Sequence, residues 1–339
     1  MSEGGRDQIL VTRQLSGAVM TRLREHFEVD VYEGRGAMPR EELVRRVAGK
    51  AAAITLLTDR VDREVLEAAG PGLRIVANYA VGYDNVDVAC CTEQRVLVGN
   101  TPDVLTETTA DMAFALLAAA ARRICEGDRF VRSGETWIWD PGMMLGWDLH
   151  HKTLGIVGFG RIGQAVARRA RGFAMRVLYA ANAPAPSEVE RETGAERMPL
   201  DELLEESDFV SLHVPLTPAT RHMIGARELE RMKRTAVLVN TARGPVVDEQ
   251  ALADALRDGT IFAAALDVFE REPKVLPALR ELPNAVLVPH LGSATVETRL
   301  AMGMLAAENV LAALDGRRPP ALVNPQAWPN ARARRNAAP

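Results

Sequence analysis

One stretch, KTLGIVGFGRIGQAVARRARG at residues 152–172, limits the fold of this chain more than any other. It opens with an apolar run, Leu154–Val157, which is typical of a strand buried on both faces of a sheet. The pattern G-x-G-x-x-G follows, formed by Gly158, Gly160 and Gly163, and leads into an amphipathic helical pattern. We expect these glycines, in that order, to allow a tight turn, the approach of a pyrophosphate and close packing of helix on strand. A strand, this turn and a helix together predict dinucleotide binding; the alternative is an ordinary glycine-rich turn.

The composition excludes several classes of function. At 339 residues the chain is too long for one ordinary domain and suits two. Its net charge of −4 argues against binding to nucleic acid or to an anionic membrane surface. The three cysteines, at 90, 91 and 125, have no metal or redox spacing, so we expect no metal site. The N-terminus lacks the apolar segment of a signal peptide, and the longest apolar run, Met112–Ala121, is far short of the ~20 residues of a membrane span. We therefore expect a cytoplasmic protein.

The first hundred residues alternate between strand and helix patterns. Strands are expected at 8–12, 29–32, 52–57, 73–78 and 96–99, and helices at 16–27, 39–47 and 63–69. This alternation predicts a parallel sheet covered by helices on both faces. The segment has no glycine-rich phosphate motif, so we expect it to do something other than hold the dinucleotide.

A second series of the same kind follows the glycine motif. Its strands are expected at 176–179, 209–214, 236–240, 262–266 and 286–288, and its helices at 200–207, 228–232 and 249–258. This is the doubly wound layout, in which ligands bind at the carboxyl ends of the strands. Long helices are expected at 106–123 and 296–314, and a disordered tail at 328–339.

Three of the four tryptophans, Trp137, Trp139 and Trp147, fall in an irregular stretch before the glycine motif. One interpretation is a small satellite core under a long loop. The other is a contact with a second subunit, because exposed aromatic side chains concentrate at interfaces. These residues alone leave both interpretations open.

Polar side chains follow three strands of the second series. Arg243 comes after the strand at 236–240, where it is placed to bind a planar anion bidentately. Asp267 comes after the next strand, and His290 after the one that follows. Each of these residues alone has an ordinary structural explanation. An arginine, a carboxylate and a histidine at the same edge of one sheet together predict a catalytic site.

Four ordered motifs resemble the signatures of the D-isomer-specific 2-hydroxyacid dehydrogenases. They are the glycine motif, VNTARG at 239–244, DVFEREP at 267–273 and PHLGS at 289–293. A further segment, NYAVGYDNVD at 78–87, is similar to the substrate loop of that family. The resemblance covers roughly residues 9–325 and, within the family, is greatest to the glyoxylate/hydroxypyruvate reductases.

The resemblance implies two Rossmann-like doubly wound domains with the active site in the cleft between them. The substrate domain would be discontinuous, formed by 1–102 and 293–327, and the NAD(P)-binding domain would span 103–292. The family also implies a homodimer joined through the coenzyme domain, which favours the interface interpretation of the tryptophan stretch.

The resemblance further implies roles for the polar residues. His290 would be the general acid that protonates the keto oxygen as hydride arrives from the nicotinamide. Glu272 would hydrogen-bond His290 and favour its protonated form, with Glu270 as the rival for this role. Arg243 would bind the substrate carboxylate and polarise the carbonyl. The rest of the carboxylate site would be the backbone N–H groups of Val81 and Gly82.

Cofactor contacts are implied at the same edge of the sheet. Asp267 would contact the nicotinamide carboxamide, and Thr109 would face the nicotinamide region. The other implied contacts are Gly158, Gly160, Arg161, Ile162, Gly163, Asn182, Val214, Pro215, Thr241, Ala242, His290 and Gly292.

The choice between NAD and NADP depends on a departure from the usual pattern. An NAD-specific site places Asp or Glu about 20 residues beyond the glycine motif, to bind the ribose 2′-OH. Here the strand ends LYAAN at 178–182, without that acid. The arginine that NADP-using relatives place near Asn182 is missing from this stretch too. A 2′-phosphate is not repelled and Asn182 can hydrogen-bond it, so we expect NADP or the use of both cofactors.

The expected reaction is reduction of a small 2-keto acid to the D-2-hydroxy acid. Glyoxylate and hydroxypyruvate come first as substrates, with pyruvate or bulkier keto acids behind. The chain has no room for the regulatory domain of long 3-phosphoglycerate dehydrogenases, and Val81 stands where phosphite dehydrogenases of the family carry lysine. A candidate from another class is a dinucleotide-sensing binding protein like the corepressors of this fold. Those relatives keep the residues that match Arg243, Glu272 and His290, so turnover is the observation that separates the two functions.

Overall fold

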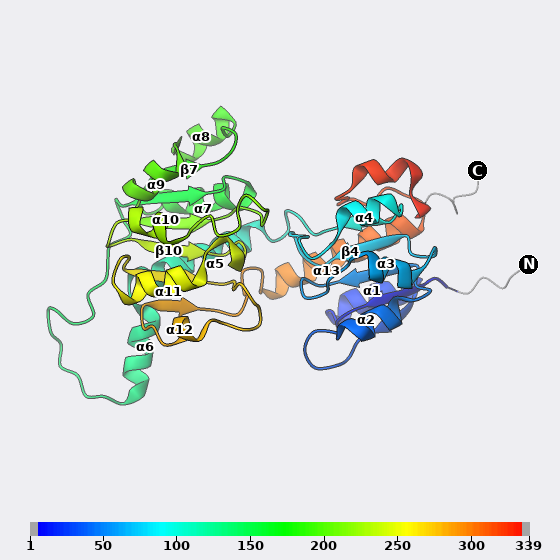
Figure 1. Cartoon of the computed structure of the whole chain (residues 1–339), viewed down its shortest axis with the longest axis horizontal. Helices are drawn as coiled ribbons and strands as arrows, with labels where there is room; N and C mark the ends of the chain where they lie inside the picture. The colour runs from blue at the N-terminus through cyan, green and yellow to red at the C-terminus, as the bar shows by residue number, and fades with distance from the viewer. Residues whose placement is uncertain (1–5, 334–339) are drawn as a thin grey trace, which may run out of the picture. The chain divides into compact units, whose positions relative to one another are not determined.

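The computed structural model describes residues 6–333, which form two compact units, each built on a parallel sheet (Figure 1). One unit takes the chain up to Leu105 and again from Thr295 onward, and the other runs from Thr106 to Ala294. The changes of unit lie a few residues later than the boundaries expected at 102/103 and 292/293.

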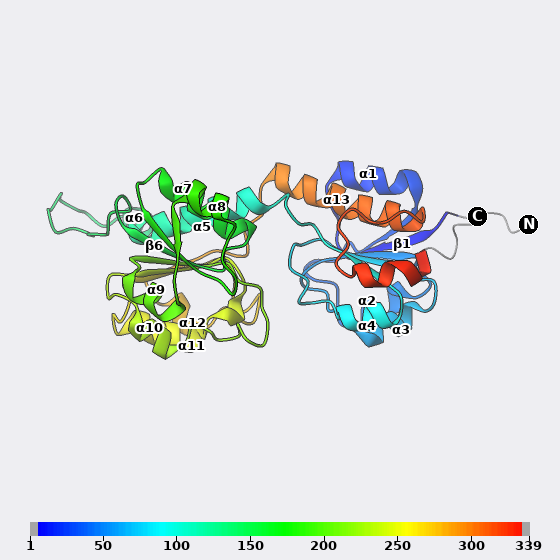
Figure 2. The same ribbon diagram turned by 90° about the horizontal axis from the view of Figure 1, so that it is seen from above.

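The first unit has a five-stranded sheet in the order β2-β1-β3-β4-β5. Its strands are β1 (Gln8–Val11), β2 (Glu28–Val31), β3 (Ala52–Thr55), β4 (Ile75–Asn78) and β5 (Leu97–Gly99). Its helices are α1 (Gly17–His26), α2 (Arg40–Val47), α3 (Arg63–Ala69), α4 (Val88–Glu93) and α13 (Val296–Leu314), with the 3-10 helix η2 (Pro325–Asn330). Helices α1 and α13 cover one face of the sheet, and α2, α3 and α4 cover the other (Figure 2). The central strands β3 and β4 are buried along their whole length, as their apolar sequences predict.

The second unit has a seven-stranded sheet in the order β12-β11-β10-β9-β6-β7-β8. Its strands are β6 (Thr153–Val157), β7 (Arg176–Ala180), β8 (Ala195–Arg197), β9 (Phe209–Leu212), β10 (Val237–Asn240), β11 (Ala263–Leu266) and β12 (Ala285–Leu287). Its helices are α5 (Thr106–Ala121), α6 (Ile124–Ser133), α7 (Arg161–Arg171), α8 (Ser187–Thr193), α9 (Leu200–Glu206), α10 (Ala226–Arg231), α11 (Glu249–Arg257) and α12 (Pro277–Arg280), with the 3-10 helix η1 (Gly244–Val246).

Helices α5 and α7 pack on one face of this second sheet, and α9, α10 and α11 pack on the other (Figure 2). Every strand pair in the sheet is parallel. From β6 the chain adds β7 and β8 toward one edge of the sheet, and from β9 it adds β10, β11 and β12 toward the other edge. The carboxyl ends of all the strands therefore share one edge, with the switch point between β6 and β9, where doubly wound sheets bind their ligands. The predicted fold class is confirmed.

An arm of about a dozen residues follows α6 and leaves the body of the second unit (Figure 1). Helix α6 buries none of its residues, and the side chains of Trp137 and Trp139 are 54% and 76% exposed. The satellite-core interpretation is therefore wrong for these two residues. Trp147 differs, because it packs edge-on against Phe262 of its own unit, with the ring centroids 6.1 Å apart.

The sequence analysis placed the start of a disordered tail at residue 328, which is too early. Helix η2 continues to Asn330, and the Arg332 guanidinium donates to the backbone carbonyl of Gly70 at 2.8 Å. The rest of the expected tail, 334–339, lies outside the described residues. In the part of the chain that is described, every helix is too short or too polar to cross a membrane.

Candidate active site

The glycine turn joins β6 to α7. Gly158 has a φ of 92°, and a Cβ placed on it would lie 2.7 Å from the backbone carbonyl of His213. A Cβ on Gly163 would lie 2.3 Å from the carbonyl oxygen of Gly158, so the first turn of α7 packs directly on the end of β6. The space at Gly160 is open, because no atom lies within 4 Å of its Cβ position. Packing therefore requires two of the glycines, and the third leaves the N-terminus of α7 accessible to a ligand.

Most of the predicted site residues lie at the carboxyl edge of the second sheet, in the loops and the first turn of α7 that follow β6, β7, β9, β10, β11 and β12. In that order they are Gly158, Gly160, Arg161, Ile162 and Gly163; Asn182; Val214 and Pro215; Thr241, Ala242 and Arg243; Asp267 and Glu272; and His290 and Gly292. Thr109 joins them from α5. Val81 and Gly82 belong to the other unit.

His290 and Glu272 form a pair, with 2.9 Å between Nδ1 of the ring and Oε2 of the carboxylate. The other carboxylate oxygen accepts from the N–H of Phe269 at 3.0 Å. Burial raises the pKa of Glu272, but the hydrogen bonds from His290 and Phe269 and the nearby Arg243 outweigh burial, so the pKa lies below its ordinary value. The carboxylate is therefore ionised at neutral pH. The second ring nitrogen of His290, Nε2, has no hydrogen-bond partner among residues 6–333.

Glu270, the rival carboxylate, faces another element. Its Oε1 accepts from the N–H of Glu249 at 3.1 Å and lies 3.2 Å from Nε2 of His222. Its own N–H donates to Glu249 at 2.6 Å. Glu270 therefore braces the start of α11, and Glu272 is the acid that contacts His290.

Asp267 holds the turn that carries His290. His290 has a φ of 55°, in the left-handed region that side-chain-bearing residues rarely adopt. Its N–H donates to the backbone carbonyl of Asp267 at 2.9 Å, and the Asp267 carboxylate accepts from the N–H groups of Leu291 and Gly292. A Cβ on Gly292 would lie 2.9 Å from that carboxylate and 3.5 Å from Thr109. Burial raises the pKa of Asp267, although the two N–H donors oppose it. The hydrogen bonds of Asp267 to the backbone of residues 290–292 therefore stabilise the unfavourable backbone conformation of His290.

Arg243 lies on the loop after β10. The side-chain amide of Asn240 donates to the Arg243 carbonyl at 2.9 Å and so braces this loop. The next residue, Gly244, has no room for a side chain, because a Cβ there would lie 1.9 Å from the carbonyl carbon of Phe269. The Arg243 loop is therefore held against the segment that leads from β11 to Glu272. The positive charge of Arg243 helps to lower the pKa of Glu272.

The residues at this edge fit a dinucleotide cofactor. The backbone at Gly160 is open, at a helix N-terminus whose N–H groups favour phosphate. The hydroxyl of Thr241, just past β10, is buried and has no hydrogen-bond partner in the described chain. A buried hydroxyl without a partner costs about 1–3 kcal/mol, a cost that a bound polar ligand would remove.

In the first unit, Val81 and Gly82 form the turn after β4. Their carbonyls are held by the side-chain amides of Asn100, at 2.8 Å, and Asn78, at 2.9 Å. Within the described residues, neither N–H group donates a hydrogen bond. Two adjacent N–H groups on a braced turn suit a carboxylate.

The stretch that ends at Asn182 has no arginine of its own, but an arginine from another strand lies near it in the structure. Arg197 of β8 donates from Nη2 to the carbonyls of Ala181, at 3.0 Å, and Asn182, at 3.3 Å. The prediction missed α8 and β8, because a seven-residue helix and a three-residue polar strand give weak patterns. The available signal was Gly194, which ends α8 with a φ of 66°.

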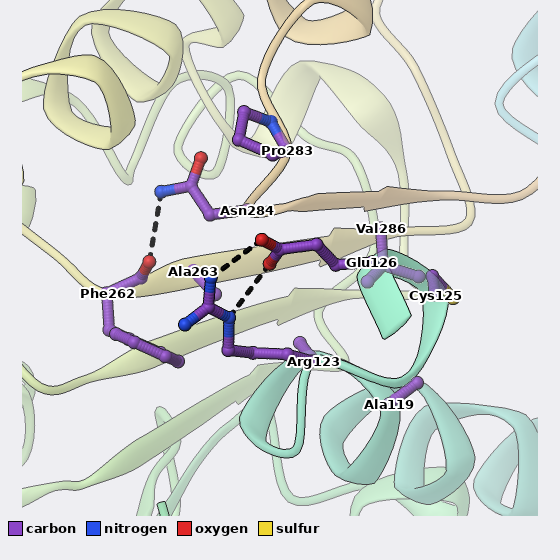
Figure 3. Close-up of a pocket in the computed structure, with 10 residues that line it drawn as sticks. Ala119, Arg123, Cys125, Glu126, Phe262, Ala263, Pro283, Asn284 and Val286 are labelled. Atoms are coloured by element: carbon purple, nitrogen blue, oxygen red, sulfur yellow. Dashed lines mark hydrogen bonds and ion pairs between the residues drawn. The ribbon is translucent and has the colours of Figure 1, made fainter. Parts of the chain in front are cut away.

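A pocket of about 220 Å³ lies on the opposite side of the second unit, at the amino ends of β11 and β12 (Figure 3). Arg123 and Glu126 at its wall form a bidentate ion pair, with N–O distances of 2.6 and 2.8 Å. None of the predicted catalytic or cofactor residues lines this pocket.

Comparisons with known proteins agree with this geometry. Residues 114–292 match the family described as D-isomer specific 2-hydroxyacid dehydrogenase, NAD binding domain. A glyoxylate reductase of Thermococcus onnurineus is 55% identical over 322 residues, which cover 94% of this chain and 96% of that protein. A crystal structure of a Thermus thermophilus protein superposes with a TM-score of 0.88 at 48% identity, covering 93% of this chain and 99% of that one. An NADPH-dependent glyoxylate/hydroxypyruvate reductase of Sinorhizobium meliloti, in complex with NADP and malonate, gives a TM-score of 0.84 at 34% identity, covering 96% and 98%.

This chain belongs to the D-isomer-specific 2-hydroxyacid dehydrogenase family. It is an NAD(P)-dependent oxidoreductase that acts on the CH–OH group of hydroxy acids and reduces keto acids. The family prediction made from the four sequence motifs is confirmed, as is the prediction of an NAD or NADP cofactor.

Proposed function

We propose that this protein reduces glyoxylate to its achiral 2-hydroxy acid and hydroxypyruvate to the D-2-hydroxy acid, with His290 as the proton donor. The observation that carries the proposal is the pair of His290 and ionised Glu272, held at one sheet edge near Arg243 and the glycine turn. The names of similar proteins support the substrate class: the Thermococcus onnurineus relative is a glyoxylate reductase, and the Sinorhizobium meliloti structure is a glyoxylate/hydroxypyruvate reductase.

The cofactor would be held by the open backbone at Gly160, by the Thr241 hydroxyl and by the other contacts inferred from the sequence motifs. When bound, the reduced nicotinamide supplies the hydride that is added to the keto carbon. The protein supplies the proton. The proposed donor is the doubly protonated ring of His290: its Nδ1–H donates to ionised Glu272, and its Nε2–H gives its proton to the carbonyl oxygen. A hydride and a proton together convert the carbonyl group to an alcohol, primary from glyoxylate and secondary from hydroxypyruvate.

Arg243 and the N–H groups of Val81 and Gly82 would bind the substrate carboxylate. A guanidinium binds a carboxylate bidentately, and its charge also polarises the adjacent carbonyl.

The test is purified protein with NADPH, and separately NADH, against glyoxylate, hydroxypyruvate, pyruvate and phenylpyruvate, followed by loss of reduced-nicotinamide absorbance. We expect turnover on glyoxylate and hydroxypyruvate, and its loss in the His290→Ala variant. Preference for pyruvate or phenylpyruvate would change the substrate assignment. Cofactor binding without turnover on any acid would overturn the proposal and favour a dinucleotide-sensing binding protein.

We also propose a homodimer joined through the second unit, in the cytoplasm. The support is the uncovered apolar arm after α6, where Ile138 is 85% exposed and Trp139 76%. Light scattering after size exclusion should give twice the mass of the chain, and a double Trp137→Ser, Trp139→Ser variant should shift it toward the monomer. A wild-type monomer at micromolar concentration would refute the dimer. Cell fractionation tests the location.

A further inference from the structure

The end of β7 is the place where a fold of this type distinguishes the ribose 2′-OH of NAD from the 2′-phosphate of NADP. Strand β7 ends at Ala180, and the next residues are Ala181, Asn182 and Ala183. This segment offers no carboxylate to accept a hydrogen bond from a 2′-OH. It offers no cationic side chain of its own to a 2′-phosphate.

Strand β8 brings a cation to this place. It pairs in parallel with β7, so that Arg197 lies beside Tyr179, near the carboxyl end of β7. The Arg197 side chain folds over that end, where Nε and Nη2 donate to the Ala181 carbonyl at 3.3 and 3.0 Å and Nη2 also reaches the Asn182 carbonyl at 3.3 Å. These carbonyls fix the plane of the guanidinium. Its Nη1 has no hydrogen-bond partner within residues 6–333.

The positive charge of Arg197 is not neutralised by a carboxylate. Glu190, on α8, is engaged by the Tyr179 hydroxyl at 2.5 Å. Glu196 points to the opposite face of the strand and pairs with Arg176 at 2.9 Å. In the described part of the chain, Arg197 itself forms no ion pair. An exposed, oriented guanidinium without a carboxylate partner suits a phosphate.

We propose that Arg197 binds the 2′-phosphate of the adenosine ribose and thereby gives this enzyme a preference for NADPH over NADH. Asn182, at the same strand end, provides a second donor through its side-chain amide. The arginine comes from the neighbouring strand, 15 residues beyond Asn182, and takes the place of a cation at the end of β7 itself. The inference rests on the proposed function for its catalytic consequence, but it concerns a binding site that can be measured without turnover.

The first experiment measures binding of adenosine 2′,5′-bisphosphate and of 5′-AMP by calorimetry, so that the nicotinamide plays no part. Arg197→Gln should weaken binding of the bisphosphate by about tenfold or more, since charge-assisted hydrogen bonds to phosphate are lost. Binding of 5′-AMP should change by less than about twofold, because that ligand has no 2′-phosphate. The matched control is Arg176→Gln, which removes the same charge at the amino end of β7 and should leave both affinities unchanged.

Two results would overturn the inference. One is an Arg197→Gln variant that binds the bisphosphate as well as the wild type does. The other is an equal loss for both ligands, which would mean that Arg197 only supports the shape of the strand end. Arg197→Lys should retain an intermediate affinity for the bisphosphate, because it keeps the charge and loses the planar fork.

Kinetics separate this inference from the proposed function. With glyoxylate as substrate, Arg197→Gln should raise KM for NADPH by about tenfold while kcat and the NADH kinetics stay nearly constant. If the wild type turns over no keto acid with either cofactor, the proposed reaction fails, and the binding comparison alone decides the role of Arg197.

Discussion

Gly160 and Gly163, in the turn between β6 and α7, should respond differently to an added methyl group. At Gly163 it should lower the stability of the fold, and at Gly160 it should lower the affinity for the cofactor. In Gly163→Ala, the new Cβ would lie 2.3 Å from the carbonyl oxygen of Gly158 and 3.1 Å from Cγ2 of Ile156. The nearer atom belongs to the backbone and cannot rotate aside. Overpacking costs about 1–3 kcal/mol, and a contact this short falls at the upper end. Alanine recovers about 1 kcal/mol of helix propensity over glycine, so we expect a net loss of about 2 kcal/mol.

The matched variant is Gly160→Ala. Gly160 has a φ of −75° and a ψ of −166°, an extended conformation that alanine adopts, and its Cβ would meet no atom within 4 Å. Folding should tolerate this change. The methyl group would instead occupy space at the N-terminus of α7 where the pyrophosphate would approach, so affinity for NADPH should fall by about tenfold or more.

Thermal unfolding without ligand, followed by calorimetric titration with NADPH, measures both effects. A loss of about 2 kcal/mol lowers the Tm of a domain of this size by about 4–8 °C. Gly163→Ala should show this decrease, and Gly160→Ala should melt within about 1 °C of the wild type. The reasoning is refuted if Gly163→Ala melts like the wild type, or if Gly160→Ala binds NADPH with unchanged affinity.

Three further substitutions test the site. Glu272→Gln should lower kcat by roughly tenfold to a hundredfold in the keto-acid assay, because Nδ1 of His290 loses its anionic partner. Because the folded-state pKa of Glu272 is lowered, its pair with His290 stabilises the fold above about pH 4.3, and this stabilisation is lost as pH falls through the lower folded value. Urea unfolding should show a gap between variant and wild type of under about 1 kcal/mol at pH 7 that closes as the pH is lowered through that range. Asp267→Asn should destabilise by about 1–3 kcal/mol and lower kcat, because Leu291 and Gly292 donate to different carboxylate oxygens and the amide replaces one of these with an NH2 group. Unchanged melting would contradict the bracing of the Gly292 turn. Ala181→Asp should reverse the cofactor preference in titrations toward NADH, because the new carboxylate repels a 2′-phosphate and accepts from a 2′-OH.

The long elements were predictable because their patterns are strong. Helix α13 runs from Val296 to Leu314, as expected, and the buried strands fall within a few residues of their predicted positions. The helix expected at 106–123 ends close to the end of α5 at Ala121, but the start of α6 directly after it was missed for a physical reason. Arg123 adopts a left-handed φ of 52° and starts a new helix there, without a glycine or proline to signal the change. A left-handed arginine has no sequence signature.

Patterns in the residues alone predicted the site to the level of strand ends, and the pairing of Glu272 with His290 came only from the family resemblance. The motifs placed both Glu270 and Glu272 near His290, and spacing alone cannot tell which one turns toward the ring. The structure separates them, because the backbone of Glu249 holds Glu270 against α11. Arg197 could not be connected to Asn182 from the sequence, because the contact depends on the register of a three-residue strand.

Strand register also sets the distance between Arg243, the proposed anion binder, and His290, the proposed proton donor. Asn240 pairs with Leu266 and Leu266 pairs with Leu287, so β10, β11 and β12 end at one level. Arg243 and His290 each follow the last residue of their strand by three positions, on opposite sides of the strand that ends before Asp267. The register of three buried strands therefore fixes this spacing more than the loops do, and a one-residue slip would turn every side chain of a strand to the other face. Buried residues of β10–β12 that do not contact the substrate thus determine whether Arg243 and His290 can act on one substrate molecule. In the proposed mechanism, Arg243 binds the carboxylate of that molecule and His290 protonates the adjacent carbonyl.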